Sequence, residues 1–388
     1  NNPVITIENI ENLPYSIEDL TPSSIVKWRV ASRTEDGTLN WSSWTIFIIR
    51  REHPFHVTVD GIGKGTSWED AMNLQDALGI AVYGDQLWVA AGTYKPTDGT
   101  DRAVSFQLKE GVELYGGFAG NETELGQRNW QENPTILSGD IGITEDNTDN
   151  SYHVLSAIGT VISPISNSTV FDGFIVEKGY ANGQGIYDTG GAVYLKYASP
   201  VIRNVWFRDN YSASSGGAVY GTDHSKAAFG NALFTNNRSG FNGGALFSWD
   251  AQMTLLNSIF YANSSVARGG AIANANYTQG ARVLNSIFLN NTSGTTGPQA
   301  DGVKIDHSLV QGGYPGIGNL SADPGLNDPE NGDFRLRSNS PVIGTGNTEQ
   351  IPEWLTVDFS GHTRMSDGKI NMGLYEDFIH TPVLITPL

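Results

Sequence analysis

The feature that most constrains the fold is a short motif that recurs at a nearly constant interval. Two glycines, an alanine and an apolar residue occur together four times, and the first glycines are 26, 27 and 26 residues apart. A fixed period of this length is typical of a chain wound into stacked coils, with each copy of the motif beside the next. The four copies are Gly190-Gly191-Ala192-Val193, Gly216-Gly217-Ala218-Val219, Gly243-Gly244-Ala245-Leu246 and Gly269-Gly270-Ala271-Ile272.

A second motif follows the same period. An asparagine is followed three residues later by phenylalanine, and these asparagines are 27, 26 and 28 residues apart. A further asparagine comes three residues after each phenylalanine. The pairs are Asn204 and Phe207, Asn231 and Phe234, Asn257 and Phe260, and Asn285 and Phe288; the further asparagines are Asn210, Asn237, Asn263 and Asn291. Two motifs on one period favour stacked coils strongly.

These repeats predict an all-β fold, a right-handed single-stranded parallel β-helix. Each coil contributes short strands that pair in parallel with their copies in the next coil, about 4.8 Å away. The four repeat phenylalanines should form an inward column, with stacking worth about 0.5–1.5 kcal/mol per pair beyond burial. The asparagine column should hydrogen-bond along its own length. The paired glycines should form the coil corners, because glycine accepts a positive φ or a tight turn.

Composition and charge narrow the class of protein. The chain has 46 glycines and no cysteine, and 39% of its residues are hydrophobic, which suits a turn-rich β protein and excludes thiolate metal sites. A net charge of −18 disfavours nucleic acids and anionic membranes as partners, and it also disfavours polyanionic glycans unless calcium bridges them. We find no run long and apolar enough to span a bilayer. Since the chain starts at Asn1 without Met, we expect a processed or trimmed piece of a longer exported protein.

The first 52 residues predict a different kind of module. Three strand-like segments lie at 4–7, 25–30 and 44–49. The sequences Asp19-Leu20-Thr21-Pro22, Lys27-Trp28-Arg29-Val30 and Trp41-Ser42 resemble the second half of a fibronectin type III domain. This resemblance implies a partial β-sandwich over residues 1–52.

The C-terminal residues 379–388 include a segment that is similar to the first strand of the same kind of module. It runs from Thr381 to Leu388. One interpretation is that the chain begins and ends inside consecutive modules. The other is that the tail strand completes the half sandwich of a neighbouring copy, which would make copies of the chain its partners.

The segment 53–378 is expected to be the β-helix itself. Its beginning predicts a capping helix over about 67–81, with Ser67 as N-cap and an apolar face that includes Trp68 and Leu74. Strand-like periods of two follow this helix. The order resembles the start of pectate-lyase-like right-handed β-helix proteins, in which a short helix covers the open end of the sheets. The segment 321–378 is similar to the closing segment of bacterial surface β-helix proteins, and we expect it to cap the C-terminal end.

The paired motifs resemble the repeats of the chlamydial polymorphic outer-membrane protein family. The resemblance rests on the Gly-Gly-Ala-apolar and Phe-x-x-Asn patterns and covers about the middle third of the chain. Members of that family are surface-exposed adhesins, so the resemblance implies an extracellular, cell-surface location. The chain shows no sign of their membrane-embedded barrel.

One loop, residues 139–150, gathers acidic side chains. Carboxylates in such a loop could act in glycoside hydrolysis or bind calcium. The spacing does not match an EF-hand loop, and a solvated acidic loop is the simpler interpretation. The acidic residues are Asp140, Glu145, Asp146 and Asp149.

The histidines give no metal-ligand pair at a recognised spacing. Only His53 and His56 are close in sequence, and Pro54 disfavours a helix that would place them on one face. We therefore assign no catalytic and no metal-binding residue. The remaining histidines are His153, His224, His307, His362 and His380.

Arginines and aromatic residues of the repeat region remain as candidates for a glycan surface. A uronate lyase needs a cationic side chain to neutralise the substrate carboxylate and a base to take the C5 proton. The arginines could line a groove or serve as exposed solubilising charges, and the aromatics could stack on sugars or cover the sheet. The candidates are Arg203, Arg208, Arg238 and Arg268, with Tyr194, Tyr211, Tyr220, Trp249, Tyr261 and Tyr277.

These observations favour an extracellular structural or adhesive module, one unit of a larger surface assembly or filament. The alternatives are a carbohydrate-active enzyme, either polysaccharide lyase or glycoside hydrolase, and a glycan-binding β-helix without catalysis. No cofactor is implied other than calcium in the acidic loop.

Overall fold

The computed structural model describes residues 24–49, 51–144, 146–275 and 280–379. The tail strand expected at 381–388 lies outside the described residues, so its pairing with a neighbouring copy stays a prediction. No helix among the described residues is long and apolar enough to cross a membrane.

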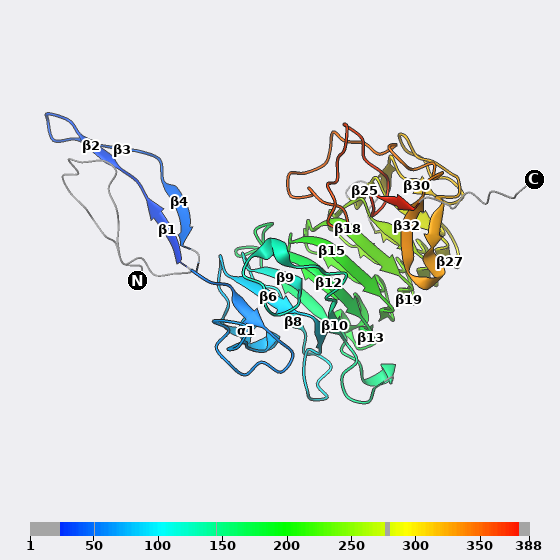
Figure 1. The fold of residues 1–388 in the computed structure, drawn as a ribbon, viewed down its shortest axis with the longest axis horizontal. Coiled ribbons are helices and arrows are strands. Elements are labelled where there is room, and N and C mark those ends of the chain that lie inside the picture. Colours follow the sequence, from blue (N-terminus) through cyan, green and yellow to red (C-terminus); the bar gives the residue numbers. More distant parts are fainter. Residues whose placement is uncertain (1–23, 50, 145, 276–279, 380–388) are drawn as a thin grey trace, which may run out of the picture.

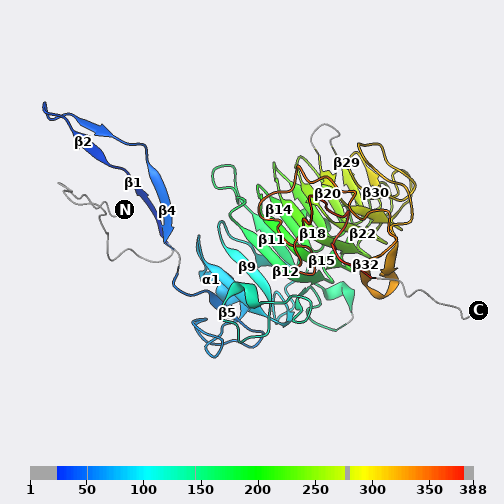
Figure 2. The ribbon, with the colours of Figure 1, turned by 45° about the horizontal axis from the view of Figure 1, so that its top comes forward.

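The N-terminal part forms a narrow ribbon that projects from one end of the main body (Figures 1 and 2). β1 (Ser24–Trp28) pairs antiparallel with β4 (Thr45–Ile49), and β2 (Ala31–Arg33) pairs with β3 (Leu39–Trp41). The Arg29 guanidinium stacks between the rings of Trp41 and Trp44, at 4.1 and 4.4 Å from their centroids. Both tryptophans are about half exposed. The ribbon carries Lys27-Trp28-Arg29-Val30 and Trp41-Ser42 of the fibronectin-like resemblance, whereas Asp19-Leu20-Thr21-Pro22 lies outside the described residues. The resemblance stays a prediction.

The main body is a parallel β-helix, as the repeats predict. Its longest sheet stacks nine successive coils, and every strand pair in it is parallel. In the order of the chain the stacked strands are β5 (Phe55–Val57), β6 (Gln86–Ala90), β9 (Glu113–Phe118), β12 (Val170–Glu177), β15 (Val201–Arg208), β18 (Ala228–Thr235), β21 (Thr254–Leu256), β25 (Arg282–Leu284) and β29 (Lys304–Asp306). The same sheet includes β7 (Gly92–Tyr94), β10 (Thr135–Ser138), β22 (Ile259–Tyr261), β26 (Ile287–Leu289) and β30 (Leu309–Val310).

Two further parallel sheets, of seven and five strands, form the other sides of the coils. The second sheet consists of β8 (Phe106–Gln107), β11 (Leu155–Ile158), β14 (Val193–Lys196), β17 (Val219–Thr222), β20 (Leu246–Ser248), β24 (Ile272–Asn274) and β28 (Ala300–Asp301). The third consists of β13 (Tyr180–Ala181), β16 (Tyr211–Ser212), β19 (Arg238–Ser239), β23 (Ser264–Ser265) and β27 (Thr292–Ser293). Short 3-10 helices occur at η1 (Leu125–Gln127), η2 (Asn147–Asp149), η3 (Gly185–Asp188) and η4 (Pro329–Asn331).

The repeat phenylalanines stack inside the coils. Phe207 and Phe234 have ring centroids 4.9 Å apart, Phe234 and Phe260 4.7 Å, and Phe260 and Phe288 4.6 Å, with interplanar angles of 15° or less. All four side chains are fully buried. Each ring therefore contributes both its buried area and an offset stacking contact to the core.

The first asparagine column marks a bend in four successive coils, within β15 and β18, between β21 and β22, and between β25 and β26. Asn204, Asn231, Asn257 and Asn285 all have φ between 47° and 53°, a left-handed conformation that asparagine tolerates better than most residues. The expected ladder is only partly formed. Asn231 donates to Asn204 at 2.8 Å and Asn285 donates to Asn257 at 3.5 Å, whereas the Asn257 amide donates to the Asn371 carbonyl at 2.9 Å. The reason is that these side chains face the C-terminal segment.

The second asparagine column is the continuous ladder. Asn210, Asn237 and Asn263 each donate to the side-chain oxygen of the next asparagine at 2.9–3.0 Å. The ladder of asparagines ends at Asn291. The same oxygen also accepts the backbone N–H of the preceding asparagine. Asn291 in turn donates to Gln299 at 2.7 Å. These buried amides satisfy one another and fix the register of the coils.

The paired glycines form the corners before the second sheet. The first glycine of each pair has φ between 60° and 67°. A Cβ on the second glycine would lie within 2.1–2.8 Å of the carbonyl oxygen of the next coil. Only glycine therefore fits at both positions. The first glycines are Gly190, Gly216, Gly243 and Gly269, and the second are Gly191, Gly217, Gly244 and Gly270.

The capping helix is shorter than the sequence predicts. α1 spans Leu74–Ile80, and its N-cap is Asn73, whose side chain accepts the backbone N–H of Asp76 at 2.9 Å. The expected start at Ser67 is wrong, because the residues before Asn73 make backbone hydrogen bonds outside a helix, among them Gly65 to Asp70. Leu74, Ala77 and Leu78 of α1 are buried in the core of the β-helix.

The C-terminal segment, residues 321–379, lies along the side of the β-helix, whereas the sequence predicts a cap at its end. Its strands β31 (Leu326–Asp328), β32 (Asp333–Arg337) and β33 (Phe378–Ile379) form a separate small sheet. Its apolar residues pack on outward side chains of successive coils. The cluster contains Leu233, Ile259, Ile287 and Leu309 of the β-helix and Leu326, Phe334, Leu336, Val342, Phe359, Met372 and Leu374 of the segment. The prediction of an end cap fails because these outward positions are apolar and need cover.

Candidate functional site

An open groove lies where the C-terminal segment passes beside the long sheet. Its floor consists of outward residues of β18, β21, β25 and β29, and its volume is about 260 Å³. In β21, β25 and β29 the middle residue is buried in the core, so the residues on either side of it point outward. We call this site the outer groove. It is lined by Ala228, Thr254, Leu256, Arg282, Val283, Leu284, Lys304, Asp306, Gln350, Pro352 and Trp354.

The register of the coils puts polar side chains in one row on the floor. Thr254 pairs with Arg282, and Arg282 pairs with Lys304, in three successive coils. Neighbouring strands lie about 4.8 Å apart, so the row presents one polar side chain per coil. A parallel apolar row ends at Asp306, which follows Leu256 and Leu284 in register.

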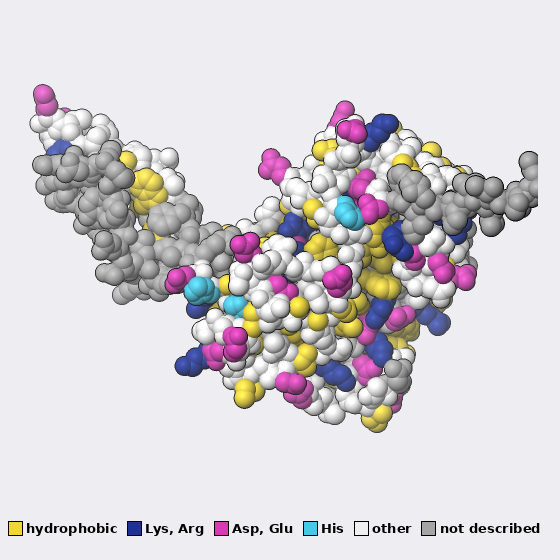
Figure 3. Space-filling model, in the orientation of Figure 1, with side chains coloured by type: hydrophobic (Ala, Val, Ile, Leu, Met, Phe, Trp, Pro, Cys, Tyr) yellow, Lys and Arg dark blue, Asp and Glu magenta, His cyan; other side chains and the backbone are white. Residues whose placement is uncertain are grey.

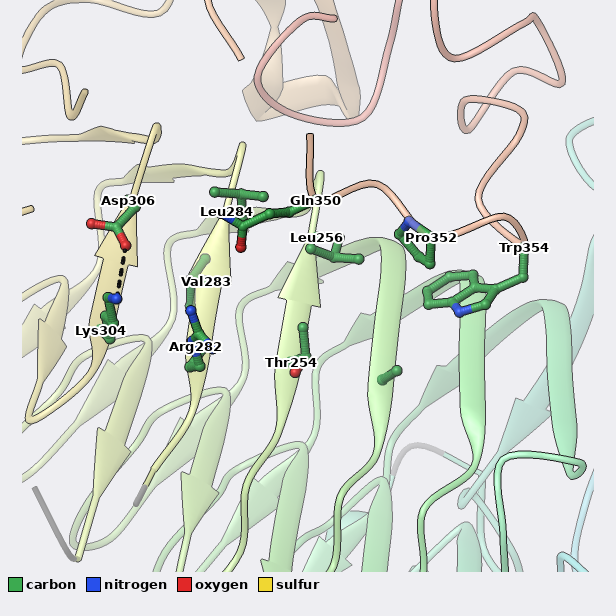
Figure 4. Close-up of a pocket in the computed structure, with 11 residues that line it drawn as sticks. Thr254, Leu256, Arg282, Val283, Leu284, Lys304, Asp306, Gln350, Pro352 and Trp354 are labelled. Carbon is green, nitrogen blue, oxygen red and sulfur yellow. Dashed lines mark ion pairs between the residues drawn. The ribbon is translucent and has the colours of Figure 1, made fainter. Parts of the chain in front are cut away.

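The wall of the outer groove belongs to the C-terminal segment. Gln350, Pro352 and Trp354 come from a stretch that crosses above the strands, with the Trp354 ring beside the floor (Figure 4). A Cβ at Gly230 would lie 2.6 Å from this ring, so the glycine makes room for the indole. Arg203 donates to the Trp354 carbonyl. These contacts fix the position of the indole.

The charged side chains of the outer groove differ in the partners that they already have. Lys304 lies 3.5 Å from Asp306, and the other oxygen of Asp306 accepts the backbone N–H of Ile317 at 2.8 Å. Arg282 is exposed, and none of the ion pairs within the part of the chain that the structure describes includes it. The groove therefore offers a guanidinium and an ammonium on its floor and an indole at its other end (Figure 4), and its one carboxylate already has partners.

A second hollow, of about 140 Å³, lies at the turns that lead into β18 and β21. It is lined by His224, Lys226, Asp250, Ala251 and Gln252. His224 Nδ1 lies 3.3 Å from Asp250 Oδ2, and both side chains are more than half exposed. Lys226 and Gln252 precede by two residues the outer-groove residues Ala228 and Thr254, so the two hollows adjoin along the chain.

A buried ion-pair centre lies further along the same face. Asp172 accepts hydrogen bonds from Arg128 at 2.7 Å, from Arg203 at 2.8 Å and from the Asn204 amide at 2.8 Å. Burial raises the pKa of this carboxyl, but the two guanidiniums outweigh it and hold the pKa below its ordinary value. Asp172 is thus a charged structural centre that positions Arg203 and, through it, the wall of the outer groove.

The four arginines that the sequence singles out do not form one groove. Arg203 is bound to Asp172, Arg208 pairs with Glu177 at 2.6 Å, and Arg268 pairs with Asp301 at 3.3 Å. Arg238 is exposed on the third sheet, in β19. The hypothesis of an arginine groove built from these residues is wrong. Sequence reasoning missed Arg282, Lys304 and Trp354, and only the register across coils could have shown that the first two are neighbours.

The described acidic side chains of the loop 139–150 have protein partners, although Asp149 Oδ1 is buried without a hydrogen bond. Asp140 pairs with Lys178 at 2.8 Å. Asp146 accepts the backbone N–H of Thr148 and begins η2, and Asp149 accepts the N–H of Ile143 at 2.7 Å. Glu145 lies outside the described residues. Calcium binding by this loop stays a prediction.

The aromatic candidates mostly cover sheets. Tyr194 stacks on Tyr220 with centroids 5.9 Å apart, and Tyr220 stacks in the same way on Phe247. Tyr211 stacks on Tyr180 of the preceding coil at 4.6 Å. Tyr261 packs edge-on against Phe334 beneath the C-terminal segment. Trp249 is exposed, and Tyr277 lies outside the described residues.

Most of the described histidines lie apart from the outer groove. His56 is buried between the rings of Trp68 and Trp88, and His53 is exposed beside Glu52. His307 lies in the last coil, where its backbone N–H donates to Ile317. His362 lies 2.9 Å from Asp377. His380 lies outside the described residues.

Buried His153 gives a testable pH dependence. Its Nδ1 donates to the Gly190 carbonyl at 2.9 Å, its Nε2 is buried without a hydrogen-bond partner, and burial lowers its pKa from 6.5 to about 4. Because the pKa is lower in the folded state, the unfolded chain binds the proton first. The contribution of neutral His153 to the free energy of unfolding is therefore fully present above pH 6.5 and is lost as the pH falls towards 4. We expect His153 to account for about 2–3 kcal/mol of destabilisation between pH 7.5 and pH 4.5.

Urea unfolding at both pH values checks this expectation. The matched variant is His153→Phe, whose ring can keep the stacking on Tyr194, 5.2 Å away. Between pH 7.5 and pH 4.5 the variant should lose about 2–3 kcal/mol less free energy of unfolding than the native chain. An equal loss in both proteins would show that His153 does not carry the effect.

Comparisons with known proteins assign this chain to no family. The chain matches no protein-family model, and no curated protein matches it. Among solved structures it is similar to the crystal structure of pectate lyase Pel9A, with a TM-score of 0.39 and 12% sequence identity over 83% of this chain and 96% of that chain.

Proposed function

We propose that the chain is an extracellular adhesive module whose rigid β-helix binds acidic glycan chains in the outer groove. The observation that carries the proposal is the combination of Trp354, Arg282 and Lys304 around one open floor. Indole rings stack on the apolar faces of sugars, and a guanidinium binds a carboxylate or sulfate in bidentate fashion. A glycan running along the helix axis would meet Thr254, Arg282 and Lys304 in successive coils.

Local charge supports an acidic ligand even though the whole chain is acidic. The net charge of −18 is distributed over the surface, and on the face seen in Figure 3 acidic and basic side chains are interspersed. In the outer groove two cations accompany one carboxylate, and that carboxylate is engaged by Lys304 and Ile317. The attraction comes from exposed charges, so binding should weaken as salt is added.

Binding without catalysis is the simpler function for this groove. A lyase or hydrolase needs a base or a carboxylate pair that can reach the reacting atoms. Asp306, the carboxylate of the groove, already accepts a hydrogen bond and pairs with a lysine. A rigid rod with a binding groove on its side suits an adhesin, which presents a surface at a distance from its attachment.

Substitutions in the outer groove test the proposal. We expect Trp354→Ala and Arg282→Ala each to weaken binding of polygalacturonate by at least tenfold, which is about 1.4 kcal/mol. Trp354→Ala removes the stacking on the sugar, and Arg282→Ala removes the charged hydrogen bonds to its acidic group. Affinity electrophoresis or calorimetry with acidic and neutral polysaccharides measures the effect, in EDTA and again with calcium, which also tests the acidic loop.

Two exposed residues far from the groove provide matched controls. Trp44→Ala removes an indole from the N-terminal ribbon, and Arg238→Ala removes a guanidinium from the third sheet. Both variants should bind like the native chain. Equal binding of neutral and acidic polysaccharides, or equal losses in the control variants, would contradict an acidic-glycan site in the outer groove.

A second candidate function is a carbohydrate-active enzyme, and the His224–Asp250 contact favours it. A histidine oriented by a carboxylate is a common general base, and this pair lines the hollow that adjoins the outer groove. Incubation with polysaccharides, followed by absorbance of unsaturated uronate and by reducing ends, would reveal turnover. Turnover that disappears in His224→Ala would replace adhesion as the proposed function.

A further inference from the structure

We propose that Asp358, His362 and Asp377 form a binding site for a first-row divalent transition-metal ion, with Zn²⁺ the best match. The three residues offer two carboxylate oxygens and one imidazole nitrogen, and these ligand atoms all lie within 4.8 Å of one another. The site belongs to the C-terminal segment. It is separate from the residues that line the outer groove, so it does not depend on the glycan proposal.

A tight loop brings the first two ligands together. The Asp358 N–H donates to the His362 carbonyl at 2.7 Å, and Val357 bridges Thr363 across the loop. The third ligand comes from Asp377, immediately before β33, and its Oδ2 lies 2.9 Å from His362 Nδ1. The same nitrogen lies 3.9 Å from Asp358 Oδ2. A metal ion would therefore connect the loop to the start of β33.

Asp358 is held in place before any ligand arrives. Its side chain is fully buried, and one oxygen accepts the backbone N–H groups of Ser360 and His362 at 2.8 and 2.9 Å. The other oxygen accepts the N–H of Glu376 at 2.8 Å. A preorganised carboxylate loses little entropy on binding an ion, because its orientation is already fixed. Metal-ligating carboxylates are typically hydrogen-bonded in this way.

The other two ligands are open to solvent. The side chains of His362 and Asp377 are 55% and 53% exposed, so an ion can enter and water can complete its coordination. The two carboxylates balance the charge of a divalent ion.

The donor set distinguishes between metals. An imidazole nitrogen with carboxylate oxygens suits Zn²⁺ and its neighbours, whereas Ca²⁺ and Mg²⁺ prefer oxygen ligands alone. Three protein ligands with an open side resemble the ligand number of sites that keep a water on the metal. The ordinary alternative is a plain ion pair between His362 and Asp377, which would show no metal dependence.

Metal titration of the whole chain tests the site. Calorimetry with Zn²⁺ should show one ion bound per chain at pH 7.5, and Co²⁺ should give the absorption spectrum of a site with nitrogen and oxygen ligands. His362→Ala and Asp377→Asn, both surface changes, should each lower Zn²⁺ affinity at least tenfold. Zn²⁺ should also slow proteolysis of the C-terminal segment in the native chain but not in His362→Ala.

The matched control is His53→Ala, which removes another exposed histidine that lies near one carboxylate, at 3.9 Å from Glu52. Its Zn²⁺ affinity should equal that of the native chain. Absence of Zn²⁺ binding, unchanged binding in His362→Ala, loss of binding in His53→Ala, or a preference for Ca²⁺ would each overturn the assignment. None of these outcomes would bear on the glycan proposal, because the two sites share no residue.

Discussion

Phe260→Ala is expected to lower the free energy of unfolding by about 3–5 kcal/mol. The ring is fully buried and stacks on Phe234 at 4.7 Å and on Phe288 at 4.6 Å. Its removal deletes buried apolar area, leaves a cavity that neighbouring coils cannot close, and interrupts the stack in the middle. Urea unfolding followed by circular dichroism gives the value.

An exposed phenylalanine provides the control for this substitution. Phe241 is 57% exposed, so Phe241→Ala should change stability by less than about 0.5 kcal/mol. Phe260→Leu should fall between the two, because it keeps much of the volume but loses the ring. Similar losses for Phe260→Ala and Phe241→Ala would mean that the column contributes no more than the surface.

Arg364→Met is expected to lower the free energy of unfolding by about 3–5 kcal/mol, by a different mechanism. Arg364 is 1% exposed and donates to Glu376 at 2.7 Å, to the Leu374 carbonyl at 2.9 Å and to the side chain of Asn231. It thereby ties the C-terminal segment to the first asparagine column. Without it Glu376 keeps a buried carboxylate with no counter-ion, and the pKa of Glu376 is already raised by burial.

Two measurements separate this mechanism from general damage. The double variant Arg364→Met with Glu376→Gln should recover part of the loss, because the second change removes the stranded charge. The cost of Arg364→Met alone should also shrink as the pH falls, because the carboxyl of Glu376, whose pKa burial already raises, then binds a proton and loses its charge. A loss that neither changes with pH nor recovers in the double variant would assign the effect to packing alone.

Much of the fold could be predicted from the sequence because the β-helix is periodic. The positions of the phenylalanine column and of the glycine corners follow from the spacing of the motifs, since each coil repeats the environment of the last. The start of α1 could not be predicted as well. Ser67 and Asn73 are both suitable caps, and the backbone pairing of the residues between them decides the choice.

The sequence by itself determined the parallel coils, because a local repeat encodes each parallel contact. Only the tertiary structure decided that the C-terminal segment lies along the side of the coils. It thereby decided that Trp354 lines one groove with Arg282 and Lys304, that Arg364 reaches Asn231, and that Asp377 reaches His362. These contacts join residues far apart in the chain, except the last, and none follows a period. The side chains that form the candidate sites are therefore those whose neighbours no repeat specifies.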